Sequence, residues 1–300
     1  MLSLGIDIGG TKAHGVVLDD QNKILAEQAV ATLQGAEGVS RCLVEVADRI
    51  ADQLAISTHD FDSVGIGIPG VVDRQVGAIA SAVNLSVEQM PLRELVQDHF
   101  SALVRLDNDV KATTVAAGLL LGSTSVTYIN VGTGIAAATI DGRLIRGAAN
   151  GAGEIGHMVV NPCGDPCRCG QRGCLETIIG GAYLAPRMAA LGLDWATLDQ
   201  DQSPAGRAGF DQGVSALGQM ISLVSVAYAP QRIVLGGGVI AAAQWVVPAL
   251  QQWLRQRSQT VSFPPLAAIA DTITTLDPGL NAPAIGAALT GRSDMEGFAS

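Results

Sequence analysis

Short apolar runs, separated by glycine-rich or polar turns, recur along the N-terminal part of the chain. Apolar positions that alternate with a period of two, or that form a short continuous run, predict β-strands. Strands are therefore expected at residues 2–8, 16–18, 24–30, 64–68 and 104–106. Only short turns separate the first three, which predicts an antiparallel meander. Helical spacing starts at Leu43 with Ser40 as a candidate cap, and a second helix is expected to end at Leu121.

The same scheme of a strand closed by a glycine turn returns after Leu121. Strands are expected at 126–131, followed by a second strand and a hairpin turn at Asp141-Gly142, and at 233–235; helices are expected around 175–191, 211–228 and 282–290. The Asp, Gln, Pro and Gly content of 194–209 predicts a surface loop. Strands mixed with helices predict the α/β class, and the repetition predicts two similar halves with a cleft between them.

Composition narrows the function classes. The 300 residues are 48% hydrophobic, which allows two buried cores. The net charge of −10 and the presence of only three lysines disfavour nucleic-acid and membrane-surface binding, and no apolar run reaches the ~18 residues that span a bilayer. The N-terminus has no basic region typical of a signal peptide, so we expect a cytoplasmic protein. The charged fraction of 15%, against about 25% in typical domains, predicts that another subunit covers apolar surface, as in a homodimer or higher homo-oligomer.

Four metal-ligating side chains lie close together in the sequence. His157, Cys167, Cys169 and Cys174 supply the Cys3His set of a structural zinc site. Two glycines between the last two cysteines allow the backbone to fold closely around an ion. Glu154 precedes this segment, and Glu176 follows it. A metal loop that positions carboxylates indicates a small-molecule site beside it.

Three glycine turns each close a predicted strand, at 7–12, 132–134 and 236–238. Glycine permits positive φ and lets backbone N–H groups approach phosphate oxygens. Thr11 and Thr133 add hydroxyl donors, and Asp7 is a candidate to hold a water of nucleotide-bound Mg²⁺. Neither a Walker motif nor GxGxxG is present. One such turn is more often only a tight turn, whereas three together favour phosphate binding.

Asn108-Asp109 stands where a strand ends and a helix begins. Asn and Asp are preferred helix caps, and a carboxylate there is equally a candidate general base for an attacking hydroxyl. Both interpretations hold together if Asn108 or Asp107 caps the helix and Asp109 faces the substrate.

The motifs together resemble those of one family. They are DIGGTK at 7–12, GIGIPG at 65–70, NDV at 108–110, VGTGI at 131–135, GEIGHM at 153–158, CRCGQRGCLE at 167–176 and LGGGV at 235–239. In this order they resemble the ROK (repressor, open reading frame, kinase) family of sugar kinases, within the actin-like ATPase superfold. The resemblance runs from about residue 4 to about residue 290, and the zinc motif is its most specific part.

The resemblance implies two actin-like (ribonuclease H-like) α/β domains, 1–108 plus 284–300 and 109–283, which close over ATP-Mg²⁺ and a hexose. Phosphoryl transfer to the sugar 6-hydroxyl would use Asp109 as general base. The implied sugar ligands are Asn84, Asn108, Asp109, Glu154, His157 and Glu176. The implied nucleotide site comprises Asp7, Gly9, Gly10, Thr11, Lys12, Thr133, Gly134, Gly237 and Gly238. His157 would contact the sugar with one ring nitrogen and zinc with the other.

The chain departs from the family pattern at three places. Ala136-Ala137-Ala138 replace glycines after VGTGI, and we expect them to pack behind the loop. Residues 86–90 replace a Gly-Trp pair near the sugar, which leaves the hexose open. Lys111 stands where the family often has a neutral residue, and we expect a solvated or phosphate-facing lysine. Cys163 is taken as a bystander.

Several functions therefore stay open. Glucose is the expected substrate, and N-acetylglucosamine, N-acetylmannosamine, fructose or an amino-hexose are the alternatives. ATP is the expected donor, with polyphosphate as the alternative. A non-catalytic sugar sensor is a further possibility. A DNA-binding repressor is disfavoured, because DIGGTK begins at residue 7 and leaves no room for a preceding helix-turn-helix domain.

Overall fold

A computed structural model describes residues 1–292 of the chain. The chain forms two compact units of mixed α/β structure. Of the described residues, unit 1 comprises Met1–Thr124, Gly142–Ala152 and residues 277–292, and unit 2 comprises Ser125–Asp141 and Gly153–Leu276. Among residues 1–292, every helix is too short or too polar to cross a lipid bilayer.

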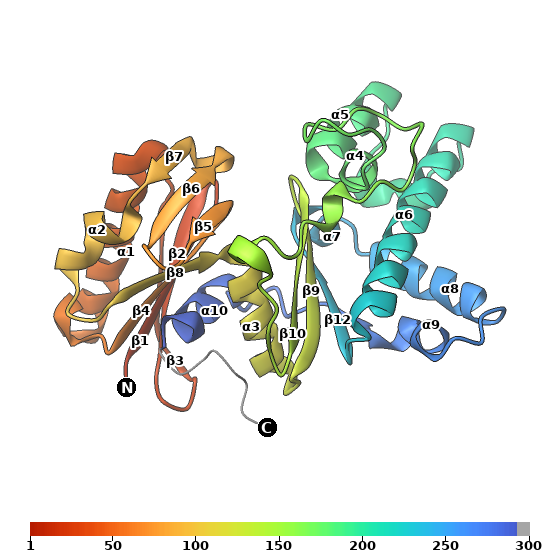
Figure 1. Cartoon of the computed structure of the whole chain (residues 1–300). Coiled ribbons are helices and arrows are strands. Elements are labelled where there is room, and N and C mark those ends of the chain that lie inside the picture. The colour runs from red at the N-terminus through yellow and green to blue at the C-terminus, as the bar shows by residue number, and fades with distance from the viewer. Residues whose placement is uncertain (293–300) are drawn as a thin grey trace. The chain divides into compact units, whose positions relative to one another are not determined.

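Unit 1 is built on a five-stranded sheet (Figure 1). Its strands are β1 (Ser3–Ile8), β2 (Lys12–Leu18), β3 (Ile24–Ala31), β4 (Ser63–Ile68) and β8 (Val104–Asn108). Their order is β3-β2-β1-β4-β8. The pairs β1–β2 and β2–β3 are antiparallel, which confirms the predicted meander, while β4 lies parallel to both β1 and β8.

Helices cover both faces of this sheet. Helix α1 (Gly35–Leu54) packs on one face, where Val46 and Ile50 contact the open side of Gly15. Helices α3 (Asp109–Leu121) and α10 (Ala282–Gly291) pack on the other face. A Cβ atom at Gly5 or Gly65 would overlap the backbone of α10, so glycine is what allows this helix to approach the sheet so closely.

The predicted start of α1 is wrong. The helix begins eight residues before Leu43, at Gly35, and Ser40 lies inside it, with its hydroxyl donating to the Ala36 carbonyl at 3.0 Å. Leu43 continues an apolar stripe that starts at Val39, while the first turn carries only polar or small residues. Apolar spacing therefore identified the buried face of the helix and not its end.

A small second layer of unit 1 was not predicted. It is a three-stranded sheet of β5 (Val71–Asp73), β6 (Ala78–Ala82) and β7 (Val87–Met90), followed by α2 (Leu92–Val96). These strands are only three to five residues long, which is too short for a clear alternating pattern.

Unit 2 repeats the strand order of unit 1. Its strands are β9 (Ser125–Val131), β10 (Ile135–Asp141), β12 (Arg232–Gly236) and β13 (Ile273–Thr274), in the order β10-β9-β12-β13. The two-residue strand β11 (Arg143–Leu144) falls in the 142–152 segment of unit 1. As in unit 1, the first strand has an antiparallel neighbour on one side and a parallel one on the other. This repeated topology confirms the prediction of two similar halves. Ala137 and Ala138 are buried in β10, in agreement with the packing interpretation.

The helices of unit 2 correct one predicted loop. They are α4 (Glu176–Ile179), α5 (Gly181–Leu191), α6 (Pro204–Tyr228), α7 (Gly238–Ala241), α8 (Val246–Ser258) and α9 (Pro264–Ala267). Within the predicted loop 194–209, residues Trp195–Gln200 form a 3₁₀ turn, and α6 already starts at Pro204. Ser203 caps α6, since its hydroxyl accepts from Gly206 N at 3.0 Å. The polar composition of this segment belongs to a helix start and not to a loop.

The two compact units do not follow the predicted domain boundaries, since residues 109–124, 142–152 and 277–283 also fall in unit 1. Helix α3 follows residue 108 and belongs to unit 1, because it packs against α10 and β4. The assignment of functional domains stays a prediction.

Candidate functional site

The four predicted zinc ligands lie together in unit 2. The ligand atoms of His157, Cys167, Cys169 and Cys174 all lie within 4.8 Å of one another. The Sγ atoms of Cys169 and Cys174 are 3.6 Å apart, and Cys167 Sγ is 3.6 Å from His157 Nδ1. Tetrahedral zinc with bonds of about 2.3 Å to sulfur has ligand-to-ligand edges of about 3.8 Å. The observed spacing therefore fits zinc, and Nδ1 of the imidazole is the nitrogen that would bind it.

Glycine backbone geometry shapes this loop as the sequence predicted. Gly170 and Gly173 have φ of 93° and 70°. A Cβ atom at Gly173 would overlap the Asn161 carbonyl, so a larger residue would push apart the two sides of the loop. Two isolated bridges, Val159 to Cys174 and Pro166 to Arg172, close the fold around the ligands.

The thiols of the cluster differ in acidity. The backbone N–H of Gln171 lowers the pKa of Cys169 to about 6, whereas burial raises the pKa of Cys174 to about 12. Zinc binds thiolates, so loading the site requires proton loss from Cys174. Cys163 is exposed and outside the cluster, which agrees with its interpretation as a bystander.

Two carboxylates of unit 1 come together from distant parts of the sequence. Asp7 lies near the end of β1, and Asp109 is the first residue of α3. Burial raises the pKa of Asp7 well above its ordinary value, and the charge of Asp109 raises it further. Burial also raises the pKa of Asp109, which hydrogen bonds and Lys111 partly oppose. The structure thus places the predicted general base within electrostatic reach of the predicted Mg²⁺-side carboxylate.

Asn108 caps α3, as one of the two sequence interpretations predicted. Its side-chain oxygen accepts from Val110 N at 3.1 Å and Lys111 N at 3.2 Å, and its Nδ2 donates to the Gly70 carbonyl at 3.2 Å. These bonds fix the amide at the base of the helix, directly beside Asp109.

Asp107 is part of a charge cluster that sequence reasoning missed. Its carboxylate is 1% exposed and is held by both guanidinium nitrogens of Arg146 at 2.9 and 2.7 Å. Arg74 Nε lies 3.5 Å from the same carboxylate. No local pattern connects residues 74, 107 and 146, because only the fold brings them together.

Lys111 was expected to be either solvated or phosphate-facing, and the structure shows that it is not solvated. The side chain is only 4% exposed, and its Nζ donates to the Ala152 carbonyl at 3.1 Å. The alkyl stem packs within unit 1, while the ammonium reaches a backbone acceptor.

The first glycine turn is tight without left-handed backbone. Gly9 N donates to the Lys12 carbonyl at 2.9 Å, which closes the turn between β1 and β2. Gly10, Thr11 and Lys12 are exposed, as a ligand-contacting turn requires, and Asn84 is exposed in the 3₁₀ turn 83–85. Neither Gly9 nor Gly10 has a positive φ, so the first of the two predicted reasons for glycine is wrong here.

The other two turns line one hollow in unit 2. Its volume is about 450 Å³, within the range of ligand pockets, and it is lined by Gly132, Thr133, Gly181, Ala182, Gly238 and Val239. The start of α5 is tied to the second turn, because Gly181 N donates to the Gly132 carbonyl at 2.8 Å and Ala182 N to the Thr133 carbonyl at 2.9 Å. Of the predicted phosphate-turn glycines, only Gly237 has a positive φ, of 91°. No pattern in the sequence indicated that Gly181 and Ala182 would line this hollow.

Glu176 has a structural partner that explains one glycine. Its Oε2 accepts from Ile135 N at 3.0 Å, and a Cβ atom at Gly134 would lie 2.6 Å from that oxygen. Glycine at 134 therefore leaves room for the carboxylate. Glu154, in contrast, is exposed, and it precedes the 3₁₀ turn that carries His157.

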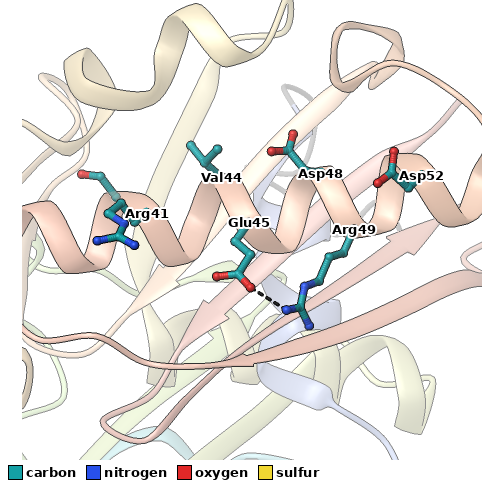
Figure 2. Close-up of a pocket in the computed structure, with 7 residues that line it drawn as sticks. Arg41, Val44, Glu45, Asp48, Arg49 and Asp52 are labelled. Carbon is teal, nitrogen blue, oxygen red and sulfur yellow. Dashed lines mark hydrogen bonds and ion pairs between the residues drawn. The ribbon is translucent and has the colours of Figure 1, made fainter.

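A second hollow lies on the outer face of α1 (Figure 2). Arg41, Glu45 and Arg49 belong to its lining, and Glu45 and Arg49 form an exposed ion pair at 2.5 Å. None of the predicted site residues lines it, and its charged side chains follow the helix surface. We assign it no ligand.

The comparisons identify the family. A family model described as the ROK family matches residues 3–292, and the chain therefore belongs to the ROK family. Over 97% of its length it superposes on a ROK hexokinase from Thermus thermophilus, with a TM-score of 0.83, 29% identity and 98% of that chain covered. A ROK family glucokinase from Streptomyces griseus in complex with glucose and AMPPNP gives a TM-score of 0.75 at 27% identity, covering 96% of this chain and 98% of that one. The mixed α/β fold is thus the actin-like fold of ROK kinases.

Curated relatives include enzymes and a regulator. A glucokinase from Halalkalibacterium halodurans is 28% identical over 83% of this chain and 84% of its own length. An N-acetylmannosamine kinase from Pasteurella multocida is 28% identical over 85% of this chain and 86% of its own. A xylose repressor from Caldicellulosiruptor bescii is 31% identical over 58% of this chain, which spans only 45% of that repressor.

Proposed function

We propose that the protein is an ATP-dependent hexose 6-kinase, with glucose as its substrate. The observation that carries the proposal is the pairing of Asp7 with Asp109 in a ROK chain that also holds an intact Cys3His cluster. The kinases among its relatives match over most of both chains, whereas the repressor matches over part of each.

In the proposed reaction, Asp109 accepts the proton of the sugar 6-hydroxyl. The hydroxyl oxygen forms a bond to the γ-phosphorus while the bond from that phosphorus to the bridging oxygen of ADP breaks. A carboxylate whose pKa is raised by burial, as that of Asp109 is, is a better base than an exposed aspartate, provided that it is still ionised.

The proposed nucleotide ligands are the Gly9–Lys12 turn in unit 1 and, separately, the turns that line the hollow of unit 2. Asp7 fits a role beside Mg²⁺, because a carboxylate oxygen is the ligand type this cation prefers and because a cation there would offset the burial and the Asp109 charge that raise the pKa of Asp7. When bound, Mg²⁺ would neutralise negative charge on the phosphate oxygens. Thr133 and Gly134 would contact phosphates, and Gly237 and Gly238 the adenosine.

The proposed sugar ligands are assigned separately to each unit. Asn84, Asn108 and Asp109 belong to unit 1, and Glu154, His157 and Glu176 belong to unit 2. With Nδ1 of His157 directed at the cysteines, Nε2 is the nitrogen for the sugar. Zinc supplies a fixed tautomer and ring orientation when bound.

A panel of sugars tests the proposal and names the substrate. ADP release from MgATP is measured with glucose, N-acetylglucosamine, N-acetylmannosamine, mannose, fructose and glucosamine, and Asp109→Asn serves as the control. Turnover on glucose that the variant lacks supports the proposal, and preference for another sugar replaces glucose by that sugar. Polyphosphate in place of ATP tests the alternative donor.

A non-catalytic sugar sensor is the second candidate, favoured by the match to the xylose repressor. Sugar binding by calorimetry together with no turnover on any sugar or donor would support the sensor and exclude the kinase. Cytoplasmic location and a homodimer remain proposals, tested by fractionation and by sedimentation.

A further inference from the structure

The start of α5 holds the glycine turn that borders the hollow of unit 2. Gly181 N donates to the Gly132 carbonyl at 2.8 Å, and Ala182 N donates to the Thr133 carbonyl at 2.9 Å. A Cβ atom at Gly181 would lie 2.9 Å from the same Gly132 oxygen, so glycine allows this close approach. All four residues line the hollow. The shape of the hollow therefore depends on where α5 begins.

Tyr183, in the first turn of α5, connects this helix start to the metal loop. Its hydroxyl accepts from Arg168 N at 3.0 Å, and the Arg168 guanidinium lies 5.6 Å from the centre of its ring. Arg168 stands between Cys167 and Cys169, two members of the Cys3His cluster. The peptide N–H that holds Tyr183 thus belongs to the metal loop itself.

The metal loop has little core of its own. Most of residues 161–173 are exposed, so few buried apolar contacts order them. Binding of a structural metal supplies folding free energy to such a loop, because the ligands are brought together around the ion. Metal binding therefore fixes the path of the chain at Arg168, and with it the donor that holds Tyr183.

We propose that Tyr183 is a positioning residue that couples the Cys3His loop to the nucleotide end of the candidate kinase site. With the metal loop ordered, the Arg168 peptide holds Tyr183, and the start of α5 holds Gly132 and Thr133 in the form that borders the hollow. The cluster thereby supports nucleotide binding as well as the orientation of His157. Tyr183 itself touches neither sugar nor nucleotide, and the nucleotide part of this inference rests on the proposed function.

Amide hydrogen exchange tests the coupling without nucleotide or turnover. Tyr183→Phe removes only the hydroxyl, and Tyr228→Phe, at the exposed end of α6, is the matched control. In zinc-loaded protein, the Gly181 and Ala182 amides should exchange roughly fivefold faster in Tyr183→Phe than in the control, which is the worth of one neutral hydrogen bond. The Ile135 amide, which α4 holds, should keep its protection. Unchanged exchange at Gly181 and Ala182 would overturn the proposal.

Zinc removal tests the same connection from the metal side. Zinc is removed with phenanthroline, which leaves Mg²⁺ free, and the affinity for MgADP is measured by calorimetry. Removal should weaken MgADP binding roughly fivefold or more in the wild type, and by a clearly smaller factor in Tyr183→Phe, which has already lost the connection. By reciprocity, MgADP should tighten zinc binding to the wild type by the same factor. Equal factors in the wild type and Tyr183→Phe would refute the coupling.

The two readouts separate the two proposals. Exchange that depends on zinc and on Tyr183, in a protein that binds no MgADP, would leave the coupling standing and remove the kinase. Binding of MgADP, with exchange that depends on neither, would leave the kinase and remove the role of Tyr183.

Discussion

Removal of Arg146 is expected to be the most destabilising single change in the charge cluster of unit 1. Its guanidinium binds the Asp107 carboxylate through two nitrogens, at 2.7 and 2.9 Å. Asp107 is 1% exposed, so water cannot replace the lost partner. Arg146→Met keeps most of the side-chain volume and leaves a buried carboxylate with Arg74 Nε at 3.5 Å as its remaining cation.

The magnitude follows from the burial of the acid. Breaking a buried ion pair by removing one partner costs about 3–5 kcal/mol. The remaining arginine and the partial exposure of Arg146, at 25%, reduce that figure, so we expect a loss of about 2–3 kcal/mol in the free energy of unfolding. The matched control is Arg49→Met on α1 (Figure 2), whose pair with Glu45 is about half-exposed on both sides. There the expected loss is about 0.3–0.5 kcal/mol.

The assay must report on unit 1. All three tryptophans, Trp195, Trp245 and Trp253, lie in unit 2, so their fluorescence follows that unit and the far-ultraviolet circular dichroism follows both. Urea unfolding is therefore recorded by both signals. An Arg146→Met midpoint indistinguishable from that of Arg49→Met in the dichroism would refute the reasoning. Adding Asp107→Asn to Arg146→Met removes the buried carboxylate charge that has lost its partner. The double variant should therefore recover part of the lost free energy of unfolding.

Three further outcomes are expected. Asp109→Asn should lower kcat by roughly 10²–10⁴ with a sugar Kd, from calorimetry, within about threefold of the wild type; retained turnover would contradict the base assignment. Cys169→Ser should lose the zinc that metal analysis finds at about one per chain, while Cys163→Ser keeps it; equal zinc contents would contradict the ligand set. Burial raises the folded-state pKa of Asp7 above 3.8, so its stabilising proton is bound at low pH and lost as pH rises through that raised pKa. Asp7→Asn without nucleotide should therefore melt higher than the wild type at pH 7, by a margin that shrinks near pH 4, and a lower melting temperature at pH 7 would contradict this.

Local sequence signals predicted the features that depend on neighbours in the chain. The longer strands of the two five-stranded sheets, the meander and the clustering of the four Cys and His side chains follow from alternation and from ligand spacing, and the structure confirms them, whereas the two-residue strands β11 and β13 were not predicted. The same signals failed where polar residues begin a helix, as at Ser40 and at 194–209. Apolar periodicity marks a buried face, whereas helix ends depend on single caps such as Ser203.

Interactions between distant segments could not be predicted. The burial of Lys111 depends on Ala152, and the bidentate contact of Asp107 depends on Arg146, residues about forty positions away. The predicted reason for the glycines was partly wrong, since Gly134 provides space for Glu176 and has no left-handed backbone. A sequence motif thus identifies residues more reliably than it identifies the force that requires them.

The repeated topology allows equivalent positions of the two units to be compared, and one of them differs in charge. Asp7 on β1 pairs with Gly67 on β4, and Asn130 on β9 pairs with Gly236 on β12. These are equivalent positions of the two sheets, each two residues before the first turn glycine. Unit 1 therefore carries an acid where unit 2 carries a neutral amide, and an Asp7 oxygen would be 3.3 Å from a Cβ atom at Gly67. The two equivalent strands β1 and β9 thus both lead into a glycine turn, but only β1 carries an aspartate, Asp7, at the compared position. In the proposed kinase, the cation and the proton transfer consequently belong to unit 1, while unit 2 supplies neutral turns for the nucleotide.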